Sequence, residues 1–317
     1  MARIAVLDDY QGIALDMADW SALAAEHAIT VFRDHLPDEA ALAERLRPFD
    51  IVCLMRERTP MRRTLIDALP SLRLIVTTGP RNASIDMAAA KARGITVCAT
   101  GHAIQGTSEL TWGLIIALAR KIALEDRAIR EGRWQSTVGI DLQGKTLGVM
   151  GLGRLGSRVA KVGLAFGMTV IAWSQSLTRE RAAEHGATLV GKDDLLRQAD
   201  VLSIHLVLGD RSRGLIGARE FDLMKRSALL VNTSRGPIVD EAALIQAIRT
   251  RRIAGAALDV FDIEPLPADH PLRNLPNTVT TPHLGYVTEA AYRTFFGDMV
   301  EDIGAFLAGK PVRVIDE

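Results

Sequence analysis

Strand-like and helix-like segments alternate along most of this 317-residue chain, and this alternation limits the folds that it can adopt. Short runs rich in aliphatic and β-branched residues occupy 3–8, 29–32, 50–55, 72–78 and 95–99. Amphipathic stretches such as 38–46 and 84–94 separate them, and Gly94 stands where the second stretch is expected to end as a helix. Strands that alternate with helices in this way form parallel sheets, so the predicted class is α/β.

A second series of strand-like runs follows a long helical pattern at 107–133, which contains neither proline nor a strand signal. The runs occupy 145–151, 169–174, 199–206, 228–234, 253–260 and 277–283. Their number matches a complete dinucleotide-binding unit. A further amphipathic helix is predicted at 288–309. We therefore expect two α/β units, joined by helices and not by a flexible linker.

Composition and charge exclude several functional classes. Hydrophobic residues make up 48% of the chain and charged residues 24%, which suits a soluble protein with a large core. The 38 basic side chains equal the 38 acidic ones, so no global field favours nucleic acid or an anionic membrane as a partner. The longest apolar stretch, 110–119, is far shorter than the roughly 20 residues that span a bilayer. We expect no membrane and no nucleic-acid partner.

Both cysteines of the chain lie in strand-like runs. Aliphatic residues flank Cys53 and Cys98, a context typical of buried, reduced thiols. The first apolar run meets Asp8 and Asp9 almost at once, so it is predicted to be a strand and not a signal peptide. A cytoplasmic location is expected on both grounds.

Three glycines in G-x-G-x-x-G spacing stand between a predicted strand and a predicted helix. Gly151 would allow a tight turn, Gly153 would let the backbone approach a pyrophosphate, and Gly156 would permit close packing of helix and strand. Phosphate oxygens would then meet free N–H groups at the positive end of the helix dipole. The pattern predicts a dinucleotide site. An ordinary turn is the alternative in a chain with 26 glycines.

The residues after the next strand bear on which dinucleotide is preferred. Folds that prefer NAD usually carry an Asp or Glu about 20 residues beyond the glycines, where it accepts hydrogen bonds from the adenosine ribose. Here the strand ending at Trp173 is followed by Ser174 and the sequence QSLTR, without a carboxylate. Hydroxyl groups with Arg179 or Arg181 could bind a 2′-phosphate. NADP is favoured over NAD, although these residues are also ordinary ones at a helix start.

Three polar residues, Arg235, Glu264 and His283, follow later strands of the second series. Ligands in open α/β sheets bind beyond the carboxyl ends of strands, where these side chains could converge. Together with GLGRLG, the segments NTSRGPIVDE, ALDVFDIEP and TPHLG resemble the D-isomer-specific 2-hydroxyacid dehydrogenase family, which includes glyoxylate/hydroxypyruvate reductases and phosphoglycerate dehydrogenases. The resemblance covers nearly the whole chain and implies that these three residues are the catalytic trio.

Reduction of a 2-oxo acid requires residues of these types. A planar guanidinium, here Arg235, can bind the substrate carboxylate and polarise the neighbouring carbonyl. His283 can give a proton to the carbonyl oxygen as hydride arrives from the nicotinamide. Glu264 would orient the imidazole and favour its charged form. No metal is expected. Taken singly, each residue is also compatible with a surface charge, a turn or a structural histidine.

The resemblance further implies an architecture and an assembly. It implies a Rossmann dinucleotide-binding domain at 100–284 and a smaller flavodoxin-like substrate-binding domain at 1–99 and 285–317, with a cleft between them. It also implies a homodimer formed through the cofactor domains, in which the helix at 107–133 is a candidate interface element. The sequence itself shows no interface.

More cofactor contacts come from the same resemblance. It places Asp259 at the nicotinamide carboxamide, and Asp259 is equally compatible with bracing its own turn. Leu206 and Thr233 are compatible with plain core and strand-end positions. The remaining cofactor positions implied by the resemblance are Arg154 and Leu155 at the pyrophosphate and Thr107 in the lining of the site.

The expected substrate-binding loop departs from the family pattern. It contains Gly79, Pro80, Arg81 and Asn82 where the family offers backbone N–H groups to a carboxylate. Because Pro80 lacks an N–H group, Arg81 or Asn82 could contribute a side-chain contact instead. A solvated surface charge is the alternative for Arg81.

Arg56 and Tyr286 are two further substrate-binding candidates. Arg56 matches a family arginine near the cleft, and Tyr286 stands where the family commonly has a small residue. Tyr286 could narrow the pocket, stack on the substrate or simply pack against the hinge.

The expected function is hydride transfer between NAD(P) and a small 2-oxo acid or D-2-hydroxy acid of the glyoxylate or hydroxypyruvate type. One alternative is a dinucleotide-sensing binding protein without turnover, since fold alone does not exclude it. The other is a formate-type dehydrogenase. Such enzymes typically pair the histidine with glutamine, whereas this chain has Glu264.

Overall fold

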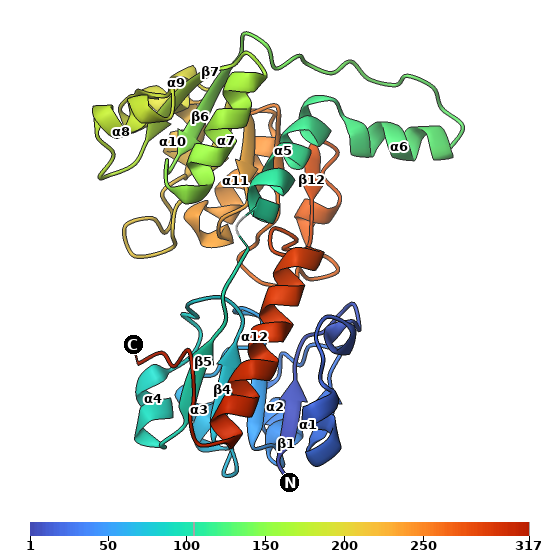
Figure 1. The fold of residues 1–317 in the computed structure, drawn as a ribbon. Coiled ribbons are helices and arrows are strands. Elements are labelled where there is room, and N and C mark those ends of the chain that lie inside the picture. Colours follow the sequence, from blue (N-terminus) through green and yellow to red (C-terminus); the bar gives the residue numbers. More distant parts are fainter. Residues whose placement is uncertain (104, 317) are drawn as a thin grey trace. The chain divides into compact units, whose positions relative to one another are not determined.

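The chain forms two compact units in the computed structural model, which describes residues 1–103 and 105–316 (Figure 1). Unit 1 comprises Met1–Ala103 and Val287–Glu317, and unit 2 comprises Ile104–Tyr286. Ile104 and Glu317, which fall within the predicted domain ranges, lie outside the described residues.

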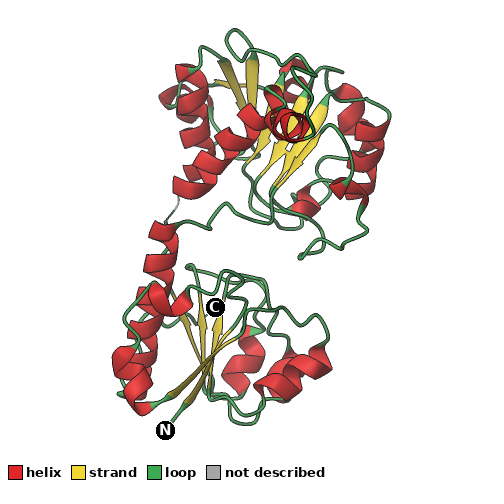
Figure 2. Ribbon diagram, turned by 90° about the vertical axis from the view of Figure 1, so that its right-hand side faces the viewer, coloured by secondary structure: helices red, strands yellow, loops and turns green. Residues whose placement is uncertain are grey.

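Unit 1 is built on a five-stranded parallel sheet in the order β2-β1-β3-β4-β5. Helices cover both faces of this sheet, so β3 and β4 are buried along their whole length (Figure 2). The order is that of flavodoxin-like folds, which confirms the predicted fold class. The strands are β1 (Arg3–Val6), β2 (Ala28–Val31), β3 (Ile51–Leu54), β4 (Leu74–Thr77) and β5 (Thr96–Ala99).

Local capping residues mark the ends of two helices of unit 1. Asp38 and Asp86 cap α2 and α4 by accepting hydrogen bonds from the backbone N–H groups of Ala41 and Ala89. Gly94 follows α4 with φ +65°, a left-handed conformation that glycine adopts without strain. The helices are α1 (Ser21–Glu26), α2 (Glu39–Leu46), α3 (Arg63–Asp67), α4 (Met87–Ala92) and α12 (Glu289–Leu307), with a 3-10 turn at Ala14–Asp16.

The C-terminal segment returns to the sheet of unit 1. Ile315 donates a backbone hydrogen bond to Val97 of β5, and Ala99 donates one to Arg313. The Arg313 side chain donates to the fully buried carboxylate of Asp302 on α12, at 2.9 Å. Burial raises the pKa of Asp302 to about 7, although Arg313 opposes the shift.

Both cysteines are free and buried in unit 1, as predicted. Cys53 lies in β3 and Cys98 in β5, and burial raises the pKa of each thiol. Neither thiol is therefore activated as a nucleophile.

Unit 2 contains a seven-stranded parallel sheet in the order β12-β11-β10-β9-β6-β7-β8. Read from β8, the first six strands have the Rossmann order. The two-residue edge strand β8 has no counterpart among the predicted runs, because a pattern of two residues carries no periodicity. The strands are β6 (Thr146–Met150), β7 (Thr169–Trp173), β8 (Thr188–Leu189), β9 (Val201–Ile204), β10 (Leu229–Asn232), β11 (Gly255–Leu258) and β12 (Thr278–Thr280).

The prediction of one helix at 107–133 is wrong. Two helices occupy this range, α5 (Gln105–Ala119) and α6 (Ile122–Arg130). The break lies at Lys121, which adopts the left-handed conformation with φ +59°. Because neither glycine nor proline marks this position, the sequence pattern does not reveal the break.

The other helices of unit 2 cover both faces of its sheet (Figure 2). Two hydrophobic clusters form the core of unit 2. Leu229 and Val231 of β10 belong to one cluster and Leu230 to the other. Successive residues of a strand point to opposite faces of the sheet, so this single strand contributes to the core on both faces. These helices are α7 (Arg154–Ala165), α8 (Arg179–Glu184), α9 (Lys192–Gln198), α10 (Ala218–Leu223) and α11 (Glu241–Arg249), with 3-10 turns at Gly236–Ile238 and Pro271–Arg273.

None of the helices in the described part of the chain combines the length and the apolar character that crossing a bilayer requires.

The buried carboxyl group of Asp302 makes the stability of unit 1 depend on pH. Its pKa is about 7 in the fold and about 4 in the unfolded chain, so the folded state binds more protons between these values. Stability contributed by Asp302 therefore falls as pH rises from about 4 to about 7. We expect the free energy of unfolding of the wild type, relative to Asp302→Asn, to fall by roughly 2–4 kcal/mol over this window.

Urea unfolding at a series of pH values measures this difference. Glu301→Gln is the matched control, because Glu301 also pairs with Arg313 but its side chain is 63% exposed. If the difference in the free energy of unfolding between the wild type and Asp302→Asn did not change with pH, the raised pKa of Asp302 would be contradicted.

Candidate active site

The glycine motif forms the turn between β6 and α7. Gly151 has φ +101°, and a Cβ atom there would lie 2.6 Å from the backbone oxygen of His205. A Cβ atom at Gly156 would lie 2.1 Å from the backbone oxygen of Gly151, so only glycine allows the helix to approach the strand this closely. At Gly153 a Cβ atom would meet no protein atom within 4 Å. Packing thus requires the outer glycines, whereas the middle one faces open space that a pyrophosphate could use.

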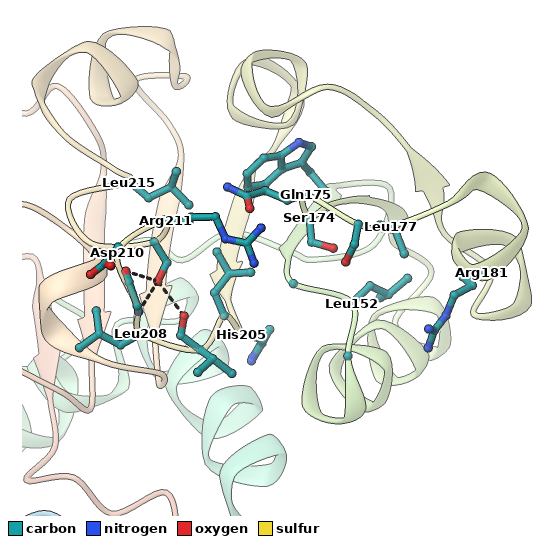
Figure 3. A pocket seen from close by; sticks show the side chains of 18 residues that line it. Leu152, Ser174, Gln175, Leu177, Arg181, His205, Leu208, Asp210, Arg211 and Leu215 are labelled. Carbon is teal, nitrogen blue, oxygen red and sulfur yellow. Dashed lines mark hydrogen bonds between the residues drawn. The ribbon is translucent and has the colours of Figure 1, made fainter. Parts of the chain in front are cut away.

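A cavity of about 580 Å³ lies beyond the carboxyl ends of β6, β7 and β9 (Figure 3). This volume suits a drug-sized or nucleotide-sized ligand. Arg181 of α8 reaches the cavity, whereas Arg179 is not among its lining residues. The predicted cofactor residues that line it are Gly151, Gly153, Ser174 and Leu206. Arg154, Leu155 and Gly156 form the first turn of α7.

The loop after β9 supplies a wall of this cavity that the sequence patterns did not indicate. It contributes residues 207–212, and Trp173 contributes an aromatic surface from the end of β7. The sequence of residues 207–212 has neither periodicity nor a recognisable motif, so it gave no reason to predict that this loop lines the cavity.

His205 also lines this cavity. Its Nε2 atom lies 2.8 Å from the Ser203 hydroxyl, and its buried Nδ1 atom has no hydrogen-bond partner among the described residues. Burial lowers the pKa of His205 to about 4, so the ring is neutral at physiological pH.

Thr107 and Thr233 belong to a group of hydroxyls between α5 and the ends of β10 and β12. The Thr107 hydroxyl donates to the backbone oxygen of Gly285 at 2.9 Å. The hydroxyls of Thr111 and Thr233 lie 2.9 Å apart, and that of Thr111 also donates to the backbone oxygen of Thr107. Both predicted threonines therefore have structural hydrogen bonds in this unit.

His283 and Glu264, predicted from separate strand ends, are in direct contact. The Nδ1 atom of His283 lies 2.6 Å from Oε2 of Glu264, and the backbone N–H of Phe261 donates to Oε1. Burial alone would raise the pKa of Glu264. Hydrogen bonding and charge from His283, the Phe261 N–H and the charge of Arg235 outweigh burial and lower it. Glu264 is therefore ionised near neutral pH and fixes Nδ1 as the nitrogen that carries a proton.

Arg235 follows β10 and is partly buried. Its Nη1 atom donates to the backbone oxygen of Ser234 at 2.8 Å. The side chain of Asn232 in turn donates to the backbone oxygen of Arg235, which fixes the start of this loop. The effect of Arg235 on the pKa of Glu264 indicates that the guanidinium belongs to the same electrostatic cluster.

Asp259 braces the turn that carries His283. Its fully buried carboxylate accepts hydrogen bonds from the Thr281 hydroxyl and from the backbone N–H groups of Leu284 and Gly285, at 2.6–2.8 Å. Burial raises the pKa of Asp259 against these hydrogen bonds. His283 has φ +54°, an uncommon backbone conformation for a residue with a side chain. The three hydrogen bonds hold the turn that imposes it.

Tyr286 packs against the catalytic candidate. Its ring meets the His283 ring edge to face, with centroids 5.2 Å apart and planes at 67°. Such aromatic contacts are favourable and restrict ring orientation. This packing places the Tyr286 ring beside the imidazole.

In unit 1, the predicted substrate residues lie at the carboxyl ends of β3 and β4. Arg56 donates through Nη1 to the backbone oxygen of Thr78 at 3.0 Å, and a Cβ atom at Gly79 would collide with this guanidinium. The Asn82 amide nitrogen donates to Arg56 and Thr77, while its oxygen accepts from Ser84. Asn82 thus holds the loop together, whereas the side chain of Arg81 is exposed.

Within residues 1–103 and 105–316, no cluster of three or more His, Cys, Asp or Glu side chains could hold a metal ion.

The chain is similar to a known protein family and to individual known proteins. The family described as D-isomer specific 2-hydroxyacid dehydrogenase, NAD binding domain, matches residues 112–285. A glyoxylate reductase of Aeropyrum pernix is 43% identical over 256 residues, which is 78% of this chain and 76% of that protein. A D-3-phosphoglycerate dehydrogenase of Archaeoglobus fulgidus is 38% identical over 314 residues, and the match covers 98% of this chain and 58% of that protein.

A solved structure is similar to this chain over nearly its whole length. The crystal structure of a phosphoglycerate oxidoreductase from Vibrio cholerae superposes with a TM-score of 0.93 at 37% identity, and the match covers 98% of this chain and all of that one.

Proposed function

The chain belongs to the D-isomer-specific 2-hydroxyacid dehydrogenase family, and we propose that it reduces a small 2-oxo acid of the glyoxylate or hydroxypyruvate type. As a member it is a nicotinamide-dependent oxidoreductase that interconverts 2-oxo and 2-hydroxy acids. The 2.6 Å contact between His283 and Glu264 carries the proposal for the mechanism, because it pairs a proton donor with the carboxylate that orients it. The identity to a glyoxylate reductase supports the substrate class.

We assign the dinucleotide to the cavity beside the glycine turn. The open space at Gly153 and the free N–H groups at the start of α7 fit a pyrophosphate. When bound, the reduced nicotinamide supplies the hydride. Arg154 and Leu155 would offer backbone N–H groups, and Leu206 an apolar surface.

Each catalytic residue has a defined task in this mechanism. Arg235 binds the substrate carboxylate and polarises the carbonyl. Since Glu264 holds the proton on Nδ1 of His283, the Nε2 atom is the one that gives a proton to the carbonyl oxygen, or takes it from the alcohol in the reverse direction. The ionised Glu264 stabilises the imidazolium that precedes proton transfer. A carboxylate in this position suits ketone reduction better than oxidation of formate, which releases no alcohol proton.

Asp259 combines two proposed roles. Three of about four acceptor positions on its carboxylate hold the turn of His283, which leaves one for the N–H₂ group of the nicotinamide carboxamide. Thr107 and Thr233 are assigned to the lining of the same region, where their hydroxyls already fix α5 against Gly285 and Thr111.

In unit 1 we assign substrate binding to Arg56 and Arg81, and to Tyr286 from unit 2. Gly79 is required by the close approach of Arg56, and its N–H already donates to the Thr100 hydroxyl. Asn82 acts by holding this loop, since its amide is fully used within it.

Turnover tests the proposed function directly. We expect the purified protein to oxidise NADPH with glyoxylate or hydroxypyruvate, and to show a higher kcat/KM with NADPH than with NADH. Absorbance of the reduced nicotinamide measures both rates, with pyruvate and bulkier 2-oxo acids as the comparison. Cofactor binding without turnover on any acid would favour the alternative of a dinucleotide-sensing protein. Formate oxidation would favour the other alternative.

Substitution of the catalytic residues separates chemistry from binding. We expect His283→Ala to lower kcat by about 10²- to 10⁴-fold, the contribution typical of a general acid, while NADPH still binds. Arg235→Lys should lower kcat/KM for the 2-oxo acid by about 10- to 100-fold, because an ammonium does not reproduce the bidentate fork.

Steady-state kinetics and calorimetric titration with NADPH measure the two effects. His270→Ala is the matched control, because His270 also pairs with a glutamate, Glu241, at 2.9 Å. Loss of NADPH affinity in His283→Ala would instead identify a structural histidine. Arg56→Lys and Arg81→Gln, measured in the same series, test the assignments in unit 1 through KM for the acid.

We further propose that the protein is a homodimer formed through α6 and the segment that follows it. Trp134 is 76% exposed and Val138 92% exposed in the segment after α6, and Ile122 and Ile129 are half-exposed on α6 itself. Ile122, Ile129 and Trp134 border one hollow. Exposed apolar side chains gathered in this way mark interaction surfaces. Burying them against a second copy would remove this apolar area from water. A cytoplasmic location is proposed on the two free, buried thiols.

Size-exclusion chromatography with light scattering tests the assembly. We expect the wild type to elute with twice the mass of the 34.4 kDa chain, and Val138→Asp to dissociate it by placing a charge in the interface. Leu15→Asp, at a half-exposed apolar residue of unit 1, is the control and should remain dimeric. A monomeric wild type would overturn the proposal.

A further inference from the structure

The nucleotide cavity of unit 2 has two polar walls. The first wall comes from the end of β7 and from α8, and includes Ser174, Gln175, Ser176 and Arg181. The second wall is the loop after β9, which contributes residues 207–212. A group that enters the cavity beside Ser174 therefore meets side chains from both directions.

The second wall is a fixed structure. The hydroxyl of Ser212 donates to the backbone oxygen of Val207 at 2.7 Å and accepts from the N–H of Gly209 at 2.9 Å (Figure 3). Ser212 itself is buried, with 7% of its surface exposed. Because the loop is held from within, the Cα atom of Arg211 has a defined position on the wall.

Arg211 extends from this loop across the cavity. Figure 3 shows its guanidinium pointing toward Ser174 and Gln175 of the opposite wall. The acidic residue of the lining, Asp210, lies on the far side of the loop from Ser174 in the same view. The space between Arg211 and Ser174 is thus bordered by a cation and a hydroxyl.

The cationic side chains of the lining have no anionic partner. Across the part of the chain that the structure describes, neither the Arg211 nor the Arg181 guanidinium has an ion pair or a side-chain hydrogen bond. Some surface arginines of this unit are paired, as Arg219 is with Asp193 at 2.6 Å, and others such as Arg213 have no ion pair with a described residue. Arg211 and Arg181 differ from these unpaired arginines because both border the same cavity. Two guanidinium groups that border one cavity without a counter-ion indicate an anionic ligand.

The chemistry of the two dinucleotides differs at this place. The 2′-phosphate of NADP carries about −1.5 to −2 charge at neutral pH and three acceptor oxygens. NAD has a neutral hydroxyl there, which gains little from a guanidinium and usually pairs with a carboxylate. Arg211, on the wall opposite Ser174, adds to Arg181 a second cation that favours NADP over NAD.

We propose that Arg211 is a cofactor-specificity residue that binds the 2′-phosphate of NADP from the loop after β9, opposite Ser174 and Arg181. This inference rests on the proposed preference for NADP and names the residue that completes it. The family resemblance assigns no role to Arg211. The lack of a carboxylate after the strand that ends at Trp173 favours NADP, but it does not point to Arg211. An arginine that merely stacked on the adenine ring would bind both cofactors equally well.

Paired binding measurements test the proposal. Calorimetric titration of the full chain uses NADPH and NADH, and 2′,5′-ADP and 5′-ADP as probes that lack the nicotinamide half. We expect Arg211→Met to weaken NADPH and 2′,5′-ADP by about tenfold or more, with less than about a twofold change for NADH and 5′-ADP. Arg211→Lys keeps the charge but not the planar fork of the guanidinium. Its affinities for NADPH and 2′,5′-ADP should therefore lie between those of the wild type and those of Arg211→Met.

Arg213→Met is the matched control. Arg213 is an exposed arginine on the same loop that is not among the lining residues, so the same loss of charge there should leave all four affinities unchanged. Because Arg211 is exposed, Arg211→Met is expected to fold, and an unchanged NADH affinity demonstrates an intact cavity.

The outcomes distinguish this inference from the proposal beneath it. A wild type that binds NADH as tightly as NADPH would overturn the NADP preference and the role of Arg211 together. A wild type that prefers NADPH, with an Arg211→Met variant that keeps this preference, would overturn the role of Arg211 alone. An equal loss for both cofactors would assign Arg211 to adenine stacking and would likewise overturn it.

Discussion

The parallel pairing of every strand in unit 2 is the constraint on which its chemistry depends. Parallel strands direct their carboxyl ends to one edge of the sheet, so residues far apart in the chain meet there. The glycine turn after β6, Arg235 after β10 and His283 after β12 all occupy this edge. Helices on both faces bury the strands, and function is therefore confined to the loops at the edge.

Asp259 links this architecture to the catalytic geometry. A buried carboxylate without partners would be strongly destabilising, but Asp259 satisfies its oxygens with donors from the turn that carries His283. The same bonds hold His283 in its left-handed backbone conformation, and Glu264 fixes the ring from the other side. The imidazole is thus positioned through both its backbone and its Nδ1 atom before any substrate binds.

The sequence predicts the parts of this protein that are local or periodic. Strand positions, the helix end at Gly94 and the glycine turn depend on nearby residues, and they appear where the patterns indicate. The break at Lys121 and the strand β8 could not be predicted, because tertiary contacts and edge pairing determine them. In the candidate site, strand ends predicted that Arg235, Glu264 and His283 would converge. The wall around Arg211, and the use of Asn82 within its own loop, depend on distances that no motif encodes.

His205 gives the nucleotide cavity a further property. A desolvated ring with a pKa of about 4 takes up no proton across the physiological range, although it forms part of the wall. The histidine therefore brings no pH-dependent charge to this wall, and the cations that border the cavity, Arg181 and Arg211, are guanidinium groups, which do not titrate. The proton that accompanies hydride is assigned in the proposed mechanism to His283, which is not among the residues that line this cavity. The proposed acid–base pair and the wall beside the proposed coenzyme site are thus separate parts of one unit.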